Sequence, residues 1–320
     1  MSGVRQAVPL AALHRLLDPV PSMRAALITL VILNLVWGGS LPATKVALDS
    51  FGPLTLTALR LVVAAALFLG LIGVRPIAQL GVRRALTAAG LGAIGFTGTQ
   101  ALQAIGATGT DAAVATVLAA TAPLWIAVLA AIVLREHLTA TVSTGLMVAL
   151  IGVGVVSGLF VHWPPSGGAV AGLVVLASGI TVALYTVLGK GELARMDPIV
   201  FTGVGVLGAT VIAVPLGAWQ AITAPRASTV VGWVMVGYLG AIVTFAGFIV
   251  WFWGLRTVPA AQAGALMFLQ PVSGLALSAL LLGNALPPVF LIGVVLVLGG
   301  TYLATGLVHA RTPGAASHYR

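Results

Sequence analysis

Uncharged polar and aromatic side chains recur at helical spacing along several apolar stretches of the chain. Asn34 and Trp37 lie three residues apart, as do Gln100 and Gln103, with Thr99 beside them. Residues at such spacing share one face of a helix. Amides, hydroxyls and aromatic rings suit a neutral or zwitterionic solute with an apolar side chain, because aromatic walls tolerate many shapes. We therefore predict a solute path formed by Asn34, Trp37, Thr99, Gln100, Gln103, Thr181, Tyr185, Phe248, Trp251, Met267 and Gln270.

Each of these residues has an alternative role in holding the protein together. Polar side chains inside a membrane also form hydrogen bonds between helices, and aromatic residues anchor helices at the membrane surface. The path role is favoured for Trp37, Gln100 and Tyr185. For the other residues it stands beside the structural role.

Two basic residues, Lys45 and Arg60, lie within or close to apolar stretches. A charge in the middle of a bilayer is costly, so neither should face lipid there. Lys45 is expected near the end of its helix, where its long side chain can reach the membrane surface. For Arg60 the favoured interpretation is structural, as a partner of Asp49 or of carbonyl groups in the first helix. The alternative is contact with a carboxylate of the solute.

The acidic residues and histidines argue against metal and enzyme chemistry. The sequence has no cysteine, and its six acidic residues lie in tails, loops or helix ends. Because proton and sodium carriers usually need a carboxylate or histidine within the membrane, we expect facilitated diffusion or exchange without ion coupling. Coupling through backbone carbonyls at broken helices is the alternative. No metal, cofactor or catalytic residue is predicted, and Glu136 is expected in an ordinary solvated turn.

The composition of the whole chain requires a membrane. The 320 residues are 60% apolar and only 7% charged, whereas soluble domains carry about 25% charged residues. This excludes an ordinary soluble enzyme, and it excludes a disordered chain, which needs low hydrophobicity. The net charge of +9 is scattered and forms no basic, aromatic face, so no nucleic-acid partner is predicted. The predicted partners are a small-molecule substrate and the lipid bilayer.

About 20 apolar residues cross the hydrocarbon of a bilayer. By this measure the sequence predicts an all-α integral membrane protein with ten transmembrane helices, at residues 25–48, 53–73, 85–106, 111–134, 141–160, 168–188, 198–218, 229–254, 260–283 and 287–307. Ten spans place both termini on one side.

The basic residues predict which side that is. With the termini in the cytoplasm, twelve of the 15 Lys and Arg residues lie inside, Lys45 and Arg226 lie outside, and Arg60 lies within a span. Such an excess inside is what the positive-inside rule describes. The excess of Arg over Lys, with much Ala, Gly and Val, is typical of a GC-rich bacterium. We predict a bacterial cytoplasmic (inner) membrane protein with both termini cytoplasmic.

The chain also repeats itself at an offset of 148 residues. Leu91-Gly92-Ala93-Ile94 recurs as Leu239-Gly240-Ala241-Ile242, and residues 91–152 match their counterparts at 17 of 62 positions, where roughly a tenth would match by chance. Two copies of a five-helix unit must be oppositely oriented, because five is odd, and inverted repeats are typical of secondary transporters. The predicted division is a cytoplasmic segment 1–24, a first repeat 25–160, a second, inverted repeat 168–307 and a cytoplasmic tail 308–320.

Prolines inside the predicted spans favour kinks, because each removes a helix hydrogen bond. Pro123 and Pro271 are equivalent in the repeat, and Pro42 lies in the first span. We predict these three prolines as hinges for alternating access.

An ordered set of four features resembles a known family. They are Trp37-Gly38-Gly39-Ser40 followed by Lys45; Arg60 in the second span; Thr121-Ala122-Pro123-Leu124 leading to Leu134-Arg135-Glu136; and Leu269-Gln270-Pro271-Val272 leading to Leu282-Gly283-Asn284. Over residues 25–305 this set resembles the EamA family of the drug/metabolite transporter superfamily, which often has Glu where this chain has Asn284. The resemblance implies ten helices in two inverted repeats, a central cavity and export of small metabolites, with amino-acid exporters as the best-known members.

The predicted function is therefore export of amino acids with neutral, aromatic or other apolar side chains, or of similar small metabolites, by alternating access. The alternatives are a proton-coupled exporter of other drugs or metabolites and a membrane-embedded transferase, for which the loops are too short. A channel is disfavoured, because channels usually repeat a pore loop by subunit symmetry. The glycine-rich fifth and tenth spans suggest a homodimer face; the protein is otherwise a monomer.

Overall fold

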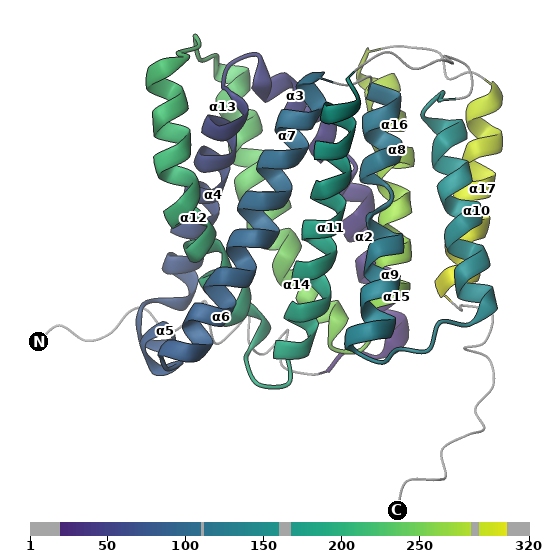
Figure 1. The fold of residues 1–320 in the computed structure, drawn as a ribbon, viewed down its shortest axis with the longest axis horizontal. Coiled ribbons are helices and arrows are strands. Elements are labelled where there is room, and N and C mark those ends of the chain that lie inside the picture. The colour runs from purple at the N-terminus through teal and green to yellow at the C-terminus, as the bar shows by residue number, and fades with distance from the viewer. Residues whose placement is uncertain (1–19, 110–111, 160–167, 283–287, 306–320) are drawn as a thin grey trace, which may run out of the picture.

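The computed structural model describes residues 20–109, 112–159, 168–282 and 288–305 of the chain. Most of the predicted segment 1–24 and all of the predicted tail 308–320 lie outside these ranges. Throughout the described ranges the regular elements are helices, packed side by side in one bundle (Figure 1). They are α2 Met23–Trp37, α3 Ser40–Leu48, α4 Pro53–Ile72, α5 Arg75–Gln79, α6 Val82–Gly92, η1 Ala93–Gly98, α7 Thr99–Gly109, α8 Ala112–Ala119, α9 Ala122–Val133, α10 Ala140–Val156, α11 Ala169–Glu192, α12 Pro198–Thr223, α13 Val230–Gly237, η2 Tyr238–Ala246, α14 Gly247–Leu255, α15 Ala260–Ala265, η3 Leu266–Phe268, α16 Leu269–Leu282 and α17 Pro288–Thr305.

Eight helical stretches of the described chain are long and apolar enough to cross a bilayer. They are Met23–Leu48, Pro53–Ile72, Val114–Val133, Ala169–Glu192, Pro198–Thr223, Val230–Leu255, Ala260–Leu277 and Pro288–Thr305. The other two predicted spans, 85–106 and 141–160, coincide with the helical run from α6 through η1 to α7 and with the shorter helix α10. The protein is thus a multi-span helical membrane protein, and the count of ten spans stays a prediction.

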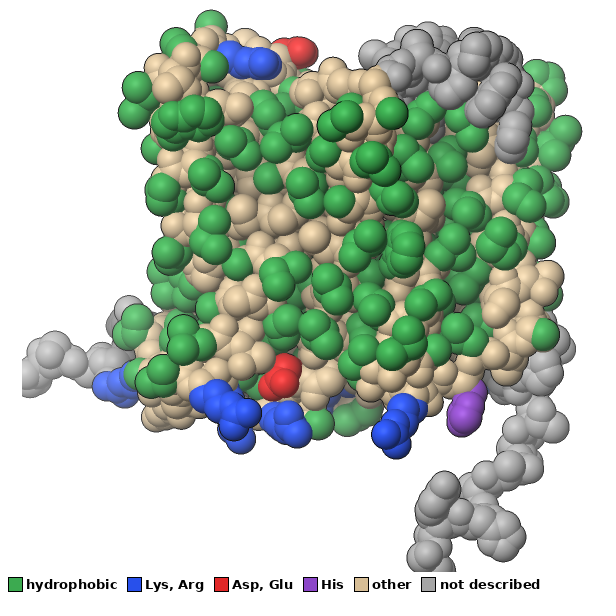
Figure 2. Space-filling model, viewed as in Figure 1, with side chains coloured by type: hydrophobic (Ala, Val, Ile, Leu, Met, Phe, Trp, Pro, Cys, Tyr) green, Lys and Arg blue, Asp and Glu red, His purple; other side chains and the backbone are tan. Residues whose placement is uncertain are grey.

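The surface of the bundle suits a membrane. Hydrophobic side chains cover its side face, whereas most Lys and Arg side chains gather along one edge (Figure 2). Large apolar residues such as Val211 and Ile222 are 74% and 80% exposed, and soluble monomers rarely expose large apolar patches. The start of α6 and the ends of α9, α11 and α14 lie along one edge of the bundle (Figure 1). We call this edge, which carries Arg83, Arg84, Arg135, Lys190, Arg195 and Arg256, the arginine-rich end. Lys45 and Arg226 lie at the opposite end, where Arg226 donates to the carbonyl of Leu48.

Local distortions of the helices recur at the predicted repeat offset. The π-helical stretch η1, Ala93–Gly98, corresponds at an offset of 148 to residues 241–246, which lie inside the second π-helical stretch η2. The 3-10 turn η3 corresponds to residues 118–120, next to the turn that separates α8 from α9. Such distortions depart from the regular i to i+4 hydrogen bonding of a helix. Their recurrence agrees with an internal repeat, and the opposite orientation of the two halves stays a prediction.

Helices α10 and α17, which correspond in the predicted repeat, pack against each other through glycines. A Cβ added at Gly145 would lie 2.5 Å from the nitrogen of Ala304, and one added at Gly293 would lie 2.7 Å from the nitrogen of Val156. Glycine therefore allows a backbone approach that larger residues prevent. Gly145, Gly152, Gly293 and Gly300 are thus occupied by contacts within one chain, whereas an added Cβ at Gly299 would meet nothing within 4 Å. A homodimer stays a prediction.

Candidate functional site

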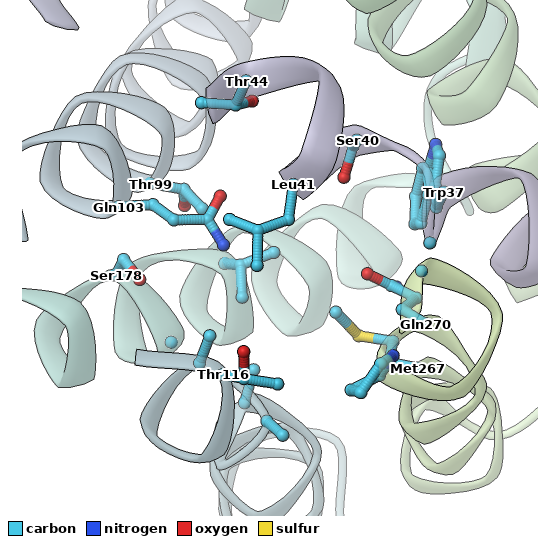
Figure 3. Close-up of a pocket in the computed structure, with 18 of the residues that line it drawn as sticks. Trp37, Ser40, Leu41, Thr44, Thr99, Gln103, Thr116, Ser178, Met267 and Gln270 are labelled. Carbon is cyan, nitrogen blue, oxygen red and sulfur yellow. The ribbon is translucent and has the colours of Figure 1, made fainter. Parts of the chain in front are cut away.

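A cavity of about 350 Å³ lies inside the bundle and extends to Lys45 at the end opposite the arginine-rich one. This volume suits one small molecule. Helices of both halves supply its wall, and their side chains converge on a common space with Leu41 near its middle (Figure 3). The polar and large side chains of the wall include Trp37, Ser40, Leu41, Thr44, Thr99, Gln100, Gln103, Thr116, Ser178, Phe248, Met267 and Gln270.

Seven of the eleven predicted path residues line this cavity: Trp37, Thr99, Gln100, Gln103, Phe248, Met267 and Gln270. Both predicted charges, Lys45 and Arg60, also line it, as do Pro42, Pro123 and Pro271. Pro123 and Pro271 lie at or near the start of a helix, each directly after a distortion of the preceding helix. The prolines therefore stand where the cavity wall departs from regular helix.

The other four predicted path residues lie behind the wall. Asn34 is buried, and its Oδ1 accepts a hydrogen bond of 2.8 Å from Nε2 of Gln270, which it thereby orients. The hydroxyl of Thr181 is 2.8 Å from that of Thr99. Tyr185 and Trp251 are buried among other aromatic rings and do not line the cavity.

Gln100 presents an unsatisfied hydrogen-bond acceptor at the cavity wall. The residue is only 9% exposed, and its Oε1 atom has no hydrogen-bond partner within the described residues. A buried acceptor without a partner costs free energy. A donor group on a bound solute, such as an ammonium or a hydroxyl, would remove that cost.

The π-helix η2 positions two further cavity residues. Nε1 of Trp37 donates to the carbonyl of Val243 at 3.0 Å. Arg60 donates to Oγ1 of Thr244 through Nε at 3.3 Å and Nη2 at 3.0 Å. Within the described chain Arg60 thus has a different partner from those expected, which were Asp49 and the carbonyls of the first helix.

A cluster of aromatic rings lies between the cavity and the arginine-rich end. This aromatic cluster consists of Trp37, Phe96, Tyr185, Phe201, Phe248, Trp251 and Phe252. Ring centroids are 4.7 Å apart for Phe96 and Phe248 and 5.1 Å apart for Tyr185 and Phe252. Tyr185 and Phe252 precede Lys190 and Arg256 by about one helical turn, so the cluster extends toward the arginine-rich end. The basic residues that define that end are not among the described residues that line the cavity.

Glu136 joins three parts of the chain at the arginine-rich end. Its carboxylate accepts from Nζ of Lys190 at 2.9 Å and from the backbone nitrogens of Ala260 at 2.8 Å and Ala261 at 3.2 Å. Lys190 also donates to the carbonyl of Val258 at 2.8 Å. The turn after α9, the end of α11 and the start of α15 are therefore tied together, and we call these contacts the Glu136 latch.

The environment of Glu136 keeps its carboxylate charged. The side chain is only 15% exposed. Burial raises the pKa of Glu136, but the hydrogen bonds from Ala260 and Lys190 and the charge of Lys190 together outweigh it and hold this pKa below its ordinary value of 4.5. The expected solvated turn is wrong for Glu136, because its partners lie 54 and 124 residues away along the chain, where no local pattern could reveal them.

Sequence reasoning also missed part of the cavity wall, namely Ser40, Thr44 and Thr116. The first two follow a break at Gly38, where α2 ends and α3 starts anew. An added Cβ at Gly38 would overlap Oγ of Ser273, so glycine is needed for the break to cross α16. The pair of glycines followed by a proline was the available signal for that break. Among the described residues no group of three acidic or histidine side chains could hold a metal ion.

The sequence relatives of this chain that carry a functional description are described as transporters. The sequence profile described as "EamA-like transporter family" matches residues 24–158 and again residues 170–306. The chain is 30% identical to a "Probable terminal-alkyne amino-acid exporter" of Streptantibioticus cattleyicolor, over 89% of this chain and 93% of that protein. It is 26% identical to an "Uncharacterized transporter" of Archaeoglobus fulgidus, over 86% and 97%. A solved crystal structure shares the fold, with a TM-score of 0.70 at 24% identity over 88% of this chain and 98% of that one.

Proposed function

Because the chain belongs to the EamA-like transporter family, we propose that it is a secondary carrier that exports amino acids with apolar or aromatic side chains, or similar small metabolites. The observation that carries this proposal is the unsatisfied Oε1 of Gln100 at the wall of a cavity that also offers the rings of Trp37 and Phe248. An acceptor for an ammonium group beside aromatic surface suits such a solute. The amino-acid exporter at 30% identity supports the same class.

Alternating access is the proposed mechanism. The cavity extends to the end that carries Lys45, while the aromatic cluster and the Glu136 latch close the arginine-rich end. In the opposite state these two closures would part and the wall around Lys45 would come together. One chain supplies the whole cavity, so we propose the monomer as the unit of transport.

The charge distribution supports the proposed location. The hydroxyl of Thr257 donates to the carbonyl of Pro21, and Ala304 packs against Gly145 near the start of α10, so both described ends lie near the arginine-rich end. The positive-inside rule favours the cytoplasm for that end. We propose a bacterial cytoplasmic membrane, with the cavity facing outward in this structure.

Transport without ion coupling is part of the proposal. Among the described residues that line the cavity, the charged ones are Lys45 and Arg60, and a carboxylate is not among them. Carriers driven by protons or sodium usually place such a group in the membrane. A proton-coupled exporter of other solutes is the competing function, and it predicts dependence on a pH gradient.

Counterflow in proteoliposomes tests this function. Liposomes loaded with unlabelled phenylalanine, leucine or methionine are expected to take up the same labelled amino acid after the pH gradient is collapsed. Gln100→Ala should raise the half-saturating concentration about tenfold, because a hydrogen bond to a charged group contributes about 1.5–3 kcal/mol. Gln262→Ala, in α15 and outside the cavity wall, is the matched control.

Two results would contradict the proposal. Uptake that needs a pH gradient would favour the proton-coupled alternative. Absence of uptake for every amino acid would move the substrate to another class of metabolite.

Pro123→Ala tests the proposed hinge. Alanine supplies the backbone N–H that proline lacks and so permits regular helix from α8 into α9, which is expected to stiffen the wall. The maximal rate of counterflow should therefore fall several-fold while solute affinity changes less than about twofold. Pro215→Ala, inside α12 and outside the cavity wall, should leave both values unchanged. Equal maximal rates for the wild type and Pro123→Ala would remove Pro123 from the mechanism.

A further inference from the structure

Arg60 brings a buried positive charge to the cavity wall. The residue is 8% exposed and lines the cavity. A guanidinium stays charged at any physiological pH. Buried charges in proteins are normally paired, yet Arg60 forms no salt bridge with a carboxylate of the described residues. Its hydrogen-bond partner there is the neutral hydroxyl of Thr244.

The geometry around Arg60 holds its guanidinium in a fixed orientation. Nε and Nη2 both donate to Oγ1 of Thr244, which uses its own proton for the carbonyl of Leu239 at 2.8 Å. One edge of the guanidinium is therefore anchored to η2. Nη1 takes no part in this contact with Thr244, so its two N–H groups can donate to another acceptor.

Among the described residues, the rest of the cavity wall adds positive charge and no carboxylate. Lys45 lines the cavity near its open end and is exposed. The acidic residues of the described chain, Asp49, Glu136, Glu192 and Asp197, do not line the cavity. Two cations in a cavity with low-dielectric walls attract an anion and raise its local concentration.

We infer that Arg60 is the carboxylate subsite of the solute and that Lys45 draws the carboxylate toward it. This inference rests on the proposed function and states which group the carrier requires on its solute. An arginine fork matches the planar geometry of a carboxylate. The unsatisfied acceptor of Gln100 would receive a donor elsewhere on the same molecule. A solute without an anionic group would leave Arg60 unpaired and should bind poorly.

Three compounds with the same phenyl ring test the contributions of the solute's carboxylate and amine one at a time. They are phenylalanine, 3-phenylpropionate, which keeps only the carboxylate, and 2-phenylethylamine, which keeps only the amine. Binding to the purified full chain in detergent is measured by isothermal titration calorimetry. We expect phenylalanine and 3-phenylpropionate to bind at least about tenfold more tightly than 2-phenylethylamine.

Variants of Arg60 then assign the preference to this residue. Arg60→Gln should weaken binding of both carboxylates at least about tenfold and leave that of the amine unchanged or tighter. Arg60→Lys keeps the charge without the fork and should retain the preference at reduced affinity. Thr244→Val keeps Arg60 but removes its anchor, so it should weaken the carboxylates less than Arg60→Gln does. Thermal unfolding of each variant shows whether it is folded. If Arg60→Gln does not fold, Thr244→Val provides the test in its place.

The outcomes distinguish this inference from the proposed function. Binding of 3-phenylpropionate that depends on Arg60, without binding of phenylalanine, would support the subsite and overturn the amino-acid substrate. Equal affinity for the amine and the carboxylates, or carboxylate binding that survives Arg60→Gln, would overturn the subsite. Failure of both carboxylates to bind at millimolar concentration would overturn it as well.

Discussion

Replacing Gly300 with alanine is expected to destabilise the protein, whereas the same replacement one residue earlier, at Gly299, should leave it as stable or more stable. A Cβ at Gly300 would overlap the nitrogen of Ala149 and lie 2.6 Å from the carbonyl oxygen of Gly145. These are backbone atoms of α10, so no side chain can turn away to make room. At Gly299 an added Cβ meets nothing within 4 Å.

The two substitutions therefore separate packing from helix propensity. Alanine in place of a glycine in a helix interior stabilises by about 0.5–1 kcal/mol through the unfolded state. Overpacking a tight contact costs about 1–3 kcal/mol. At Gly300 the second effect should exceed the first, because α17 must move away from α10 along its length.

Thermal unfolding in detergent measures the difference. We expect the Tm of Gly300→Ala to lie about 2 to 6 °C below that of the wild type, and the Tm of Gly299→Ala to equal or exceed it. Similar Tm values for the two variants would mean that α10 and α17 are not in backbone contact in solution. A counterflow assay on both variants shows whether the contact also matters for transport.

The sequence predicted the cavity wall best where regular helix continues. Thr99, Gln100 and Gln103 belong to the uninterrupted helix α7, and the periodic pattern placed all three on one face. The same reasoning put Trp251 in the path, but Trp251 lies nearly one turn beyond the cavity residue Phe248 along α14 and is buried against Trp37 in the aromatic cluster. Helical periodicity also does not show how far along the helix the cavity extends. Tyr185 therefore lies on the predicted face of α11 but belongs to the aromatic cluster and not to the cavity wall.

Local sequence patterns could not predict contacts between segments that lie far apart in the chain. The repeat offset pairs Pro123 with Pro271, and in the structure each follows a distortion of the preceding helix; their role as hinges stays a prediction. The partners of Glu136 and Arg60 depend instead on how helices far apart in the chain pack together. A charged residue in a short turn looks solvated until that packing is known.

The Glu136 latch is expected to control access from the arginine-rich end. Glu136→Gln removes the charge that holds Lys190 but keeps the size of the side chain. The two side chains are 15% and 21% exposed, so part of their interaction is screened by solvent, and the loss is about 1.4 kcal/mol, a tenfold change in the opening equilibrium. Glu192→Gln is the matched control, because Glu192 contacts the 66% exposed Arg195 at 3.8 Å and such exposed pairs contribute little.

The latch should not respond to pH in the physiological range. Its charged carboxylate is favoured in the closed state, so the pKa of Glu136 lies below 4.5. A group with a lowered pKa stabilises the closed state above its ordinary pKa and loses this effect only as the pH falls through the lowered value. Opening should therefore be equal at pH 5.5 and pH 8.

Cysteine labelling tests both expectations, since the chain has no natural cysteine. Thr186→Cys replaces the hydroxyl and methyl groups by one thiol of similar total size. Thr186 is fully buried in α11, one turn before Lys190, and its hydroxyl has no partner among the described residues. A membrane-impermeant maleimide applied at the arginine-rich end should label Thr186→Cys about tenfold faster when Glu136→Gln is added, and no faster when Glu192→Gln is added. Rates are divided by that of a free thiol at the same pH, because the thiolate is the reactive form. Equal rates with and without Glu136→Gln would show that the aromatic cluster alone closes this end, and the carboxylate would then only cap α15.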